Sequence, residues 1–137
     1  MGRADGVWGV QPFENDDAQT FLAEVLEDGP VAIEEAIDVA LDAEDDLQAP
    51  EGARAVAALA LLGAILTGNG EGLPADLRAW VTQFPPETLE SLRAPALTVL
   101  ELVDGETSEL RERWQDAEGY LAWQSSLNTL RARLTDR

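Results

Sequence analysis

The sequence predicts an all-α fold, a single compact bundle of about six helices with an irregular N-terminal arm. Apolar residues recur at the three- and four-residue spacing of a helix face along most of the chain. No segment alternates apolar and polar residues as a half-buried strand would. Gly and Pro residues separate the helical stretches. With 137 residues, 45% of them hydrophobic, the chain should form one domain, 1–137, around a single core.

The N-terminal arm, 1–14, contains Gly and Pro and lacks a helical pattern. We therefore expect it to be irregular, with Trp8 and Phe13 packing it onto the body. The first helix should begin with Asp16 as its N-cap and Gln19 as the capping-box partner. The expected apolar face of this helix comprises Ala18, Phe21, Leu22, Val25 and Leu26.

Two more helices are expected to follow directly. Gly29 ends the first helix, and Pro30 suits the first turn of the second. The second helix should face inward with Ile33 and Ile37 and outward with its acidic residues. The third helix is expected over 49–68, and because it is apolar almost all round it should be the central one.

The second half of the chain has a weaker helical pattern. Further helical segments are expected over 74–84, over 89–103, and in a last long segment that Thr107 or Ser108 can cap. Pro95 should kink or split the segment in which it lies, because proline removes a backbone donor. Gly119 is expected to bend the last segment.

The composition is strongly acidic, with 27 Asp and Glu against nine cations and a net charge of −18. Residues 1–51 carry 15 acids and one Arg, a net −14, whereas 52–137 carry a net −4. Nucleic acid and anionic membranes need a positive surface, so neither is an expected partner. A basic protein is the partner that such a field favours. The oligomeric state is not predicted.

Several kinds of chemistry are excluded by residue types that the sequence lacks. There is no Cys, His or Lys, and therefore no thiol nucleophile, Cys/His zinc site, Ser-His-Asp triad or Schiff-base lysine. We expect no cofactor and no catalytic residue, although a carboxylate-based enzyme stays open. The longest uncharged apolar run, 55–66, is shorter than the roughly 20 residues of a membrane span. It is expected to be a core helix, in a cytoplasmic protein.

The candidate partner-binding residues are acids of the second expected helix and its end. Glu34, Asp38 and Asp42 recur every fourth residue, which places them on one helix face, and Asp45 and Asp46 follow. They favour a non-catalytic acidic interaction domain that docks a basic protein, immunity- or inhibitor-like at most. The same acids also fit a plainly solvated helix face, or an acidic composition that serves solubility.

The alternative function is a divalent-metal-dependent hydrolase of phosphate compounds. Glu24 and Glu27 on the first expected helix, and Glu35 and Asp38 on the second, are each spaced i, i+3. All-α nucleotide pyrophosphohydrolases place Glu-rich motifs on two adjacent helices in this way. An EF-hand Ca²⁺ loop starting at Asp42 does not fit, because its sixth position is not Gly and its twelfth is not Glu.

Two further features have simple structural interpretations. The glycine-rich stretch 68–72 follows a helix and lacks the lysine of a P-loop, so it indicates a helix C-cap and a turn. Arg111 and Arg113, with Arg131 and Arg133, could form a cationic strip. Arginines are also favoured near a helix C-terminus by the helix dipole alone.

Two stretches resemble a known family. Residues 8–17, WGVQPFENDD, resemble the W-G-x-x-x-F-D/E-N-D start of a small bacterial family, the domain of unknown function four-two-five-nine. Residues 108–114, SELRERW, followed by Trp123 and by LRARL at 130–134, resemble the tail of that family. The stretch 3–7 lengthens the arm beyond the usual family start. The family brings no catalytic residues, so the resemblance implies that Trp8, Phe13 and Asp16 serve as an aromatic staple and a helix cap.

Overall fold

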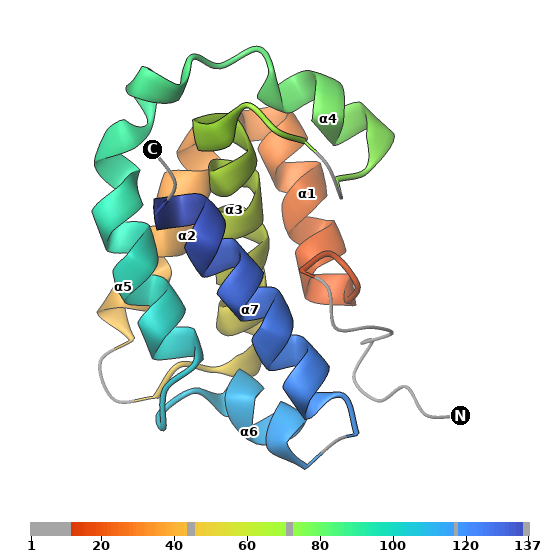
Figure 1. Ribbon diagram of the computed structural model, residues 1–137, viewed down its shortest axis with the longest axis vertical. Helices are drawn as coiled ribbons and strands as arrows, with labels where there is room; N and C mark the ends of the chain where they lie inside the picture. The colour runs from red at the N-terminus through yellow and green to blue at the C-terminus, as the bar shows by residue number, and fades with distance from the viewer. Residues whose placement is uncertain (1–11, 44–45, 71–72, 117, 136–137) are drawn as a thin grey trace.

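The computed structural model describes residues 12–43, 46–70, 73–116 and 118–135, and these residues form an all-α bundle (Figure 1). Its α-helices are α1 (Asp16–Asp28), α2 (Val31–Asp42), α3 (Ala49–Thr67), α4 (Ala75–Val81), α5 (Arg93–Val103), α6 (Glu109–Gln115) and α7 (Tyr120–Thr135). Two short 3₁₀ helices, η1 (Pro86–Thr88) and η2 (Glu90–Leu92), precede α5. The predicted fold class is confirmed, and the described residues contain seven α-helices where about six were expected.

Helix α3 is the centre of the bundle, as its apolar sequence predicts. It runs between α1 and α5, with α7 in front of it in Figure 1. By length and composition α3 could cross a membrane, but 78% of its apolar window is buried by the rest of the fold, as in a core helix. Gly52 and Gly63 leave room for close neighbours, since a Cβ at either would lie 3.4 Å from a side-chain atom of Leu110 or Arg133.

The start of α1 differs by one residue from the prediction. Asn15, and not Asp16, is the N-cap, and its Oδ1 accepts a hydrogen bond from the backbone N of Ala18 at 2.8 Å. Gln19 donates from Nε2 to the carbonyl O of Phe13 at 2.8 Å, so it fastens the preceding turn instead of completing a capping box. Phe13 is buried, as expected, and Trp8 lies outside the described residues.

Helices α1 and α2 are joined by a tight turn and pack against each other and on α3. Gly29 ends α1 with a φ of +85°, a conformation that glycine adopts without strain, and its N–H donates to the carbonyl O of Val25 at 2.8 Å. Ile33 and Ile37 of α2 are fully buried, as predicted. Leu26 of α1 was expected on the inner face, but its exposed fraction is 43%.

Two predictions for the second half are wrong in detail. Pro95 neither kinks nor splits a helix, because it is the third residue of α5, where a backbone N–H has no partner within the helix. The last segment does not continue through a bend at Gly119. It divides into α6 and α7, which are separate helices.

A buried arginine, Arg93, connects the N-terminal end of α5 to the C-terminal end of α7. Arg93 is only 6% exposed and donates to both carboxylate oxygens of Glu90, from Nε at 2.5 Å and from Nη2 at 3.1 Å. Its Nη1 also donates to the carbonyl O of Leu134, near the C-terminal end of α7. A cation is favoured at that end by the helix dipole, so Arg93 fastens α7 to the start of α5.

Candidate functional site

The predicted partner-binding acids lie on the outer side of the α1–α2 pair. Glu34, Asp38 and Asp42 are exposed on α2, and Asp46 is exposed just beyond it; we call these four residues the acidic stripe. Asp45 lies outside the described residues. In the described part of the chain, no arginine forms an ion pair with a residue of the stripe.

The stripe is exposed because the opposite side of α2 is needed for the core. The residues of α2 that are buried against α3 and α5 are Ala32, Ile33, Ala36, Ile37 and Ala40. At 100° per residue, Glu34, Asp38 and Asp42 lie about 130–170° around the helix axis from the mean direction of these five buried residues. Cations are also remote in sequence, because residues 4–53 contain neither Arg nor Lys.

One cation does reach this acidic region, from α3. Arg54 donates to the Glu24 carboxylate of α1 through both terminal nitrogens, at 2.5 and 3.2 Å, and its guanidinium carbon lies 5.5 Å from the ring centroid of Phe21. The hydrogen bond from Arg54 lowers the pKa of Glu24, and burial opposes that effect. Both side chains are partly exposed, so the ion pair itself contributes only about 0.2–1 kcal/mol.

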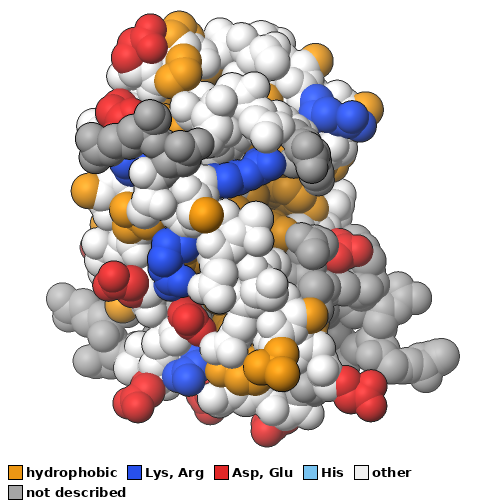
Figure 2. Space-filling model, viewed as in Figure 1, with side chains coloured by type: hydrophobic (Ala, Val, Ile, Leu, Met, Phe, Trp, Pro, Cys, Tyr) orange, Lys and Arg blue, Asp and Glu red, His pale blue; other side chains and the backbone are white. Residues whose placement is uncertain are grey.

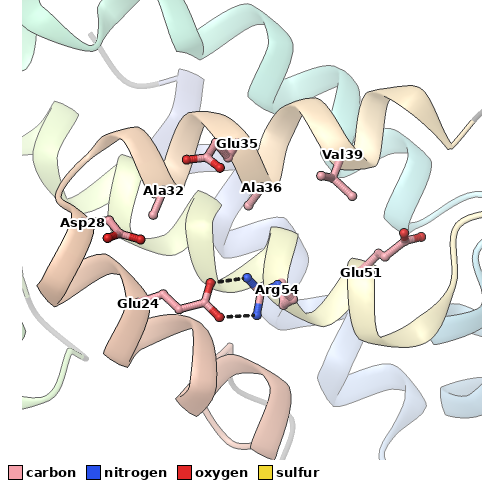
Figure 3. Close-up of a pocket in the computed structure, with 8 residues that line it drawn as sticks. All are labelled: Glu24, Asp28, Ala32, Glu35, Ala36, Val39, Glu51 and Arg54. Carbon is pink, nitrogen blue, oxygen red and sulfur yellow. Dashed lines mark hydrogen bonds and ion pairs between the residues drawn. The ribbon is translucent and has the colours of Figure 1, made fainter.

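The Arg54–Glu24 pair lines a pocket of about 140 Å³ where α1, α2 and α3 meet (Figure 3). We call it the three-helix pocket. Three more carboxylates line it, Asp28 from α1, Glu35 from α2 and Glu51 from α3. The apolar part of its wall comes from α2 and comprises Ala32, Ala36 and Val39.

The SELRERW stretch, residues 108–114, packs the start of α6 against the N-terminal end of α3. Ser108 Oγ accepts from the backbone N of Arg111 at 3.2 Å and caps α6. Glu109 Oε1 accepts from the backbone N of Ala49 at 2.7 Å, which places a carboxylate at the N-terminus of α3. Leu110 packs against Gly52 in the next turn of α3. These residues therefore serve folding.

A short parallel β-bridge also connects the residues before α3 to the start of α6. The N–H of buried Leu47 donates to the carbonyl O of Thr107 at 3.0 Å, and its carbonyl O accepts from the N–H of Glu109 at 2.8 Å. Asp46 immediately precedes Leu47 in the sequence. The far end of the acidic stripe is therefore held in place by backbone hydrogen bonds to the start of α6.

Comparison with known families decides the classification. The family model described as Domain of unknown function (DUF4259) matches residues 6–126. The chain belongs to this family. The resemblance inferred from the sequence is thereby confirmed, and no curated protein and no solved structure matches the chain.

The four arginines of this DUF4259 chain that were considered as a cationic strip all contact other residues of the chain. Arg111 Nε donates to the Tyr120 hydroxyl at 3.3 Å, a bond that raises the pKa of Arg111, and Arg113 lies 3.9 Å from a Glu109 oxygen. Arg131 donates to Asn128 at 2.7 Å. A further contact joins Arg133 to the carbonyl O of Asn69 at 3.4 Å. On the face seen in Figure 2, arginines are scattered from the upper right to the lower left, and acids lie mainly at the margins.

The residues of the alternative metal site do not assemble into one. Glu24 is engaged by Arg54, and Glu27, Glu35 and Asp38 are exposed. Among the residues that the structure describes, no three acidic side chains come together in a way that could hold a metal ion. No observation of the fold therefore favours the hydrolase.

Sequence reasoning missed the three-helix pocket of the DUF4259 domain. The missed residues are Asp28, Glu51 and Arg54, which join Glu24 and Glu35 only when α1 and α2 pack on α3. The available signal was Arg54 itself. It is the only cation between Arg3 and Arg78, and a lone cation in a long acidic stretch calls for a carboxylate partner.

Proposed function

We propose that this DUF4259 domain is a non-catalytic interaction domain whose acidic stripe docks a basic protein partner. The observation that supports this proposal is the exposure of four stripe carboxylates that have no ion-pair partner among the described residues. An immunity-type inhibitor of a basic toxin or nuclease would be a protein of this kind.

The physical basis is electrostatic attraction at short range. A carboxylate 4 Å from a partner's cation gains about 1 kcal/mol in water and about 4 kcal/mol at the effective dielectric constant of a protein surface. At physiological ionic strength the field decays over about 8 Å, so it accelerates encounter and fixes orientation more than it holds a complex.

Apolar contact beside the stripe can supply the remaining affinity. Val31 and Val39 of α2 are 49% and 48% exposed, so both can bury apolar surface against a partner. At 100° per residue around the axis of α2, Val31 falls among the stripe positions, and Val39, which lines the three-helix pocket, lies about 60° from Asp42. An interface needs such a combination of apolar contact and charged rim.

The test compares two variants of equal net charge. The stripe variant carries Glu34→Gln, Asp38→Asn, Asp42→Asn and Asp46→Asn. The control variant carries Glu87→Gln, Glu101→Gln, Glu112→Gln and Glu118→Gln, which are exposed acids outside the stripe. Each immobilised protein is exposed to lysate of the source organism, and the retained proteins are quantified by mass spectrometry.

A basic protein should be retained by the natural chain and by the control variant at about 0.1 M salt, and released at about 1 M salt. The stripe variant should lose at least nine-tenths of it. The proposal is wrong if no basic protein is retained, or if both variants lose it equally, because the loss would then follow net charge and not the stripe.

A further inference from the structure

We infer that the three-helix pocket receives an arginine side chain of the basic partner. This inference rests on the proposed function and deepens it, because it assigns one position on the acidic surface to one side chain. It is carried by the pocket's charge, by its size and by its place beside the stripe (Figure 3).

The lining of the pocket carries a net negative charge, which favours a cationic ligand. Glu24 neutralises Arg54 through two hydrogen bonds, so these two groups contribute almost no net charge. Asp28, Glu35 and Glu51 remain, and in the described part of the chain none of them has an arginine partner. Three carboxylates in the lining of one pocket give it a net negative charge, which attracts a cation.

The size of the pocket suits the end of an arginine. Its volume of about 140 Å³ is close to that of an engineered cavity of about 150 Å³ that binds benzene. A guanidinium with its neighbouring methylenes is similar in bulk to that ring. The methylenes would lie against Ala32, Ala36 and Val39, while the charged end meets the carboxylates.

Arginine fits this arrangement better than lysine. The carboxylates come from three helices and lie at different places along the lining, with Asp28 and Glu51 toward opposite ends of the view in Figure 3. A planar guanidinium offers five donors in a fixed fork and can address two carboxylates together, whereas an ammonium is a compact, strongly hydrated point charge. Guanidinium is also the more easily desolvated of the two cations.

The position of the pocket links it to the stripe. At 100° per residue around the axis of α2, the pocket-lining residue Glu35 lies about 20° from Asp42 and about 60° from Asp38, and Val39 lies about 60° from Asp42. A partner that places cations along the stripe can therefore direct one further side chain into the pocket. The stripe would attract the partner, and the pocket would fix its register.

The experiment uses the ¹⁵N-labelled full chain and three blocked tripeptides, glycyl-arginyl-glycine, glycyl-lysyl-glycine and glycyl-citrullyl-glycine. Citrulline has the shape of arginine without its charge. The arginine peptide should produce saturable NMR shifts in the backbone amides next to the pocket residues and in the Arg54 Nε–H, with a Kd of about 1–10 mM. The lysine peptide should bind at least threefold more weakly, and the citrulline peptide should not saturate.

Two variants and a matched control locate the binding. Asp28→Asn and Glu35→Gln should each weaken the arginine peptide about three- to fivefold. Glu27→Gln removes the same charge from the residue next to Asp28 but lies outside the pocket lining, and it should change the Kd by less than twofold. All three side chains are exposed, so each variant should retain the fold.

The inference is overturned if the shifts are linear and spread over all acidic helices, if the lysine peptide binds as tightly, or if Glu27→Gln weakens binding as much as Asp28→Asn does. These results would leave docking by the stripe intact, because that proposal is tested by partner capture with variants outside the pocket. Conversely, saturable arginine binding together with failed capture would overturn the proposed function and leave the pocket as a ligand site.

Discussion

Replacing Asp38 by Asn should stabilise the fold, because Asp38 has acidic neighbours on both sides along α2. Glu34 and Asp42 lie four residues before and after it, and Glu35 lies three before it, all on α2 and all exposed. Each like-charge pair at this spacing destabilises a helix by about 0.2–0.5 kcal/mol. Three pairs give about 0.6–1.5 kcal/mol. Asn and Asp have nearly equal helix propensity, so the backbone adds little.

The assay is urea unfolding followed by tryptophan fluorescence, at about 0.02 M and about 1 M salt. At low salt, Asp38→Asn should raise the free energy of unfolding by about 1 kcal/mol, and the melting temperature by about 2–6 °C for a domain of this size. At high salt the gain should fall below half, because the screening length is then about 3 Å.

Asp76→Asn is the matched control of opposite sign. Asp76 is exposed in the first turn of α4, where the helix dipole favours a carboxylate, and it has no acid three or four residues away in the described part of the chain. Its neutralisation should lower stability by about 0.3–1 kcal/mol. If Asp38→Asn is neutral or destabilising at low salt, or if its gain persists undiminished at high salt, then repulsion within the stripe is not what the substitution relieves.

Three further predictions concern the surroundings of the stripe and the pocket. Arg54→Met should lower stability by about 1 kcal/mol at neutral pH, through loss of the ion pair and of the contact with Phe21, as measured by urea unfolding. Because Arg54 lowers the folded-state pKa of Glu24 below its ordinary value of 4.5, the ion-pair part of this difference is present above pH 4.5 and is lost as the pH falls through the folded-state pKa. Glu109→Ala should cost about 1 kcal/mol, measured in the same way, because the N-terminus of α3 loses its carboxylate; an effect as small as that of Glu112→Ala would contradict this role. Mg²⁺ and Mn²⁺ at about 1 mM should shift the melting temperature no more than matched ionic strength does, and a specific rise would revive the hydrolase.

The sequence was sufficient for the helix faces and for the acidic stripe, because both depend on spacing along one helix. Ile33 and Ile37 are buried and Glu34 and Asp38 are exposed, as the 3.6-residue repeat requires. Leu26 is the exception. It belongs to the same apolar pattern as Val25, yet the fold leaves it 43% exposed, because the pattern shows where an apolar face lies but not how far its neighbours extend over it.

Features that join separate parts of the chain were not predictable in this way. The Glu109–Ala49 hydrogen bond spans 60 residues, and the Arg54–Glu24 pair spans 30. Spacing within one helix carries no information about either. The N-cap of α1 was misplaced for a different reason. Asn15, Asp16 and Asp17 are all good capping residues, so residue type alone does not show that Asn15 is the one that accepts the hydrogen bond.

Some acids of this fold make stabilising contacts, whereas those of the stripe are predicted to destabilise it. Glu109 accepts a hydrogen bond at the N-terminus of α3, and Glu90 pairs with the buried Arg93. Both contacts favour the folded state. The stripe makes no such contact among the described residues, and Asp42 adds negative charge at the C-terminal end of α2, where the helix dipole disfavours it. Solubility alone does not require this placement, since acids at helix N-termini would give the same net charge while stabilising the fold. The predicted cost of this charge pattern to stability supports the proposed docking function, because a cationic partner would relieve the same repulsion.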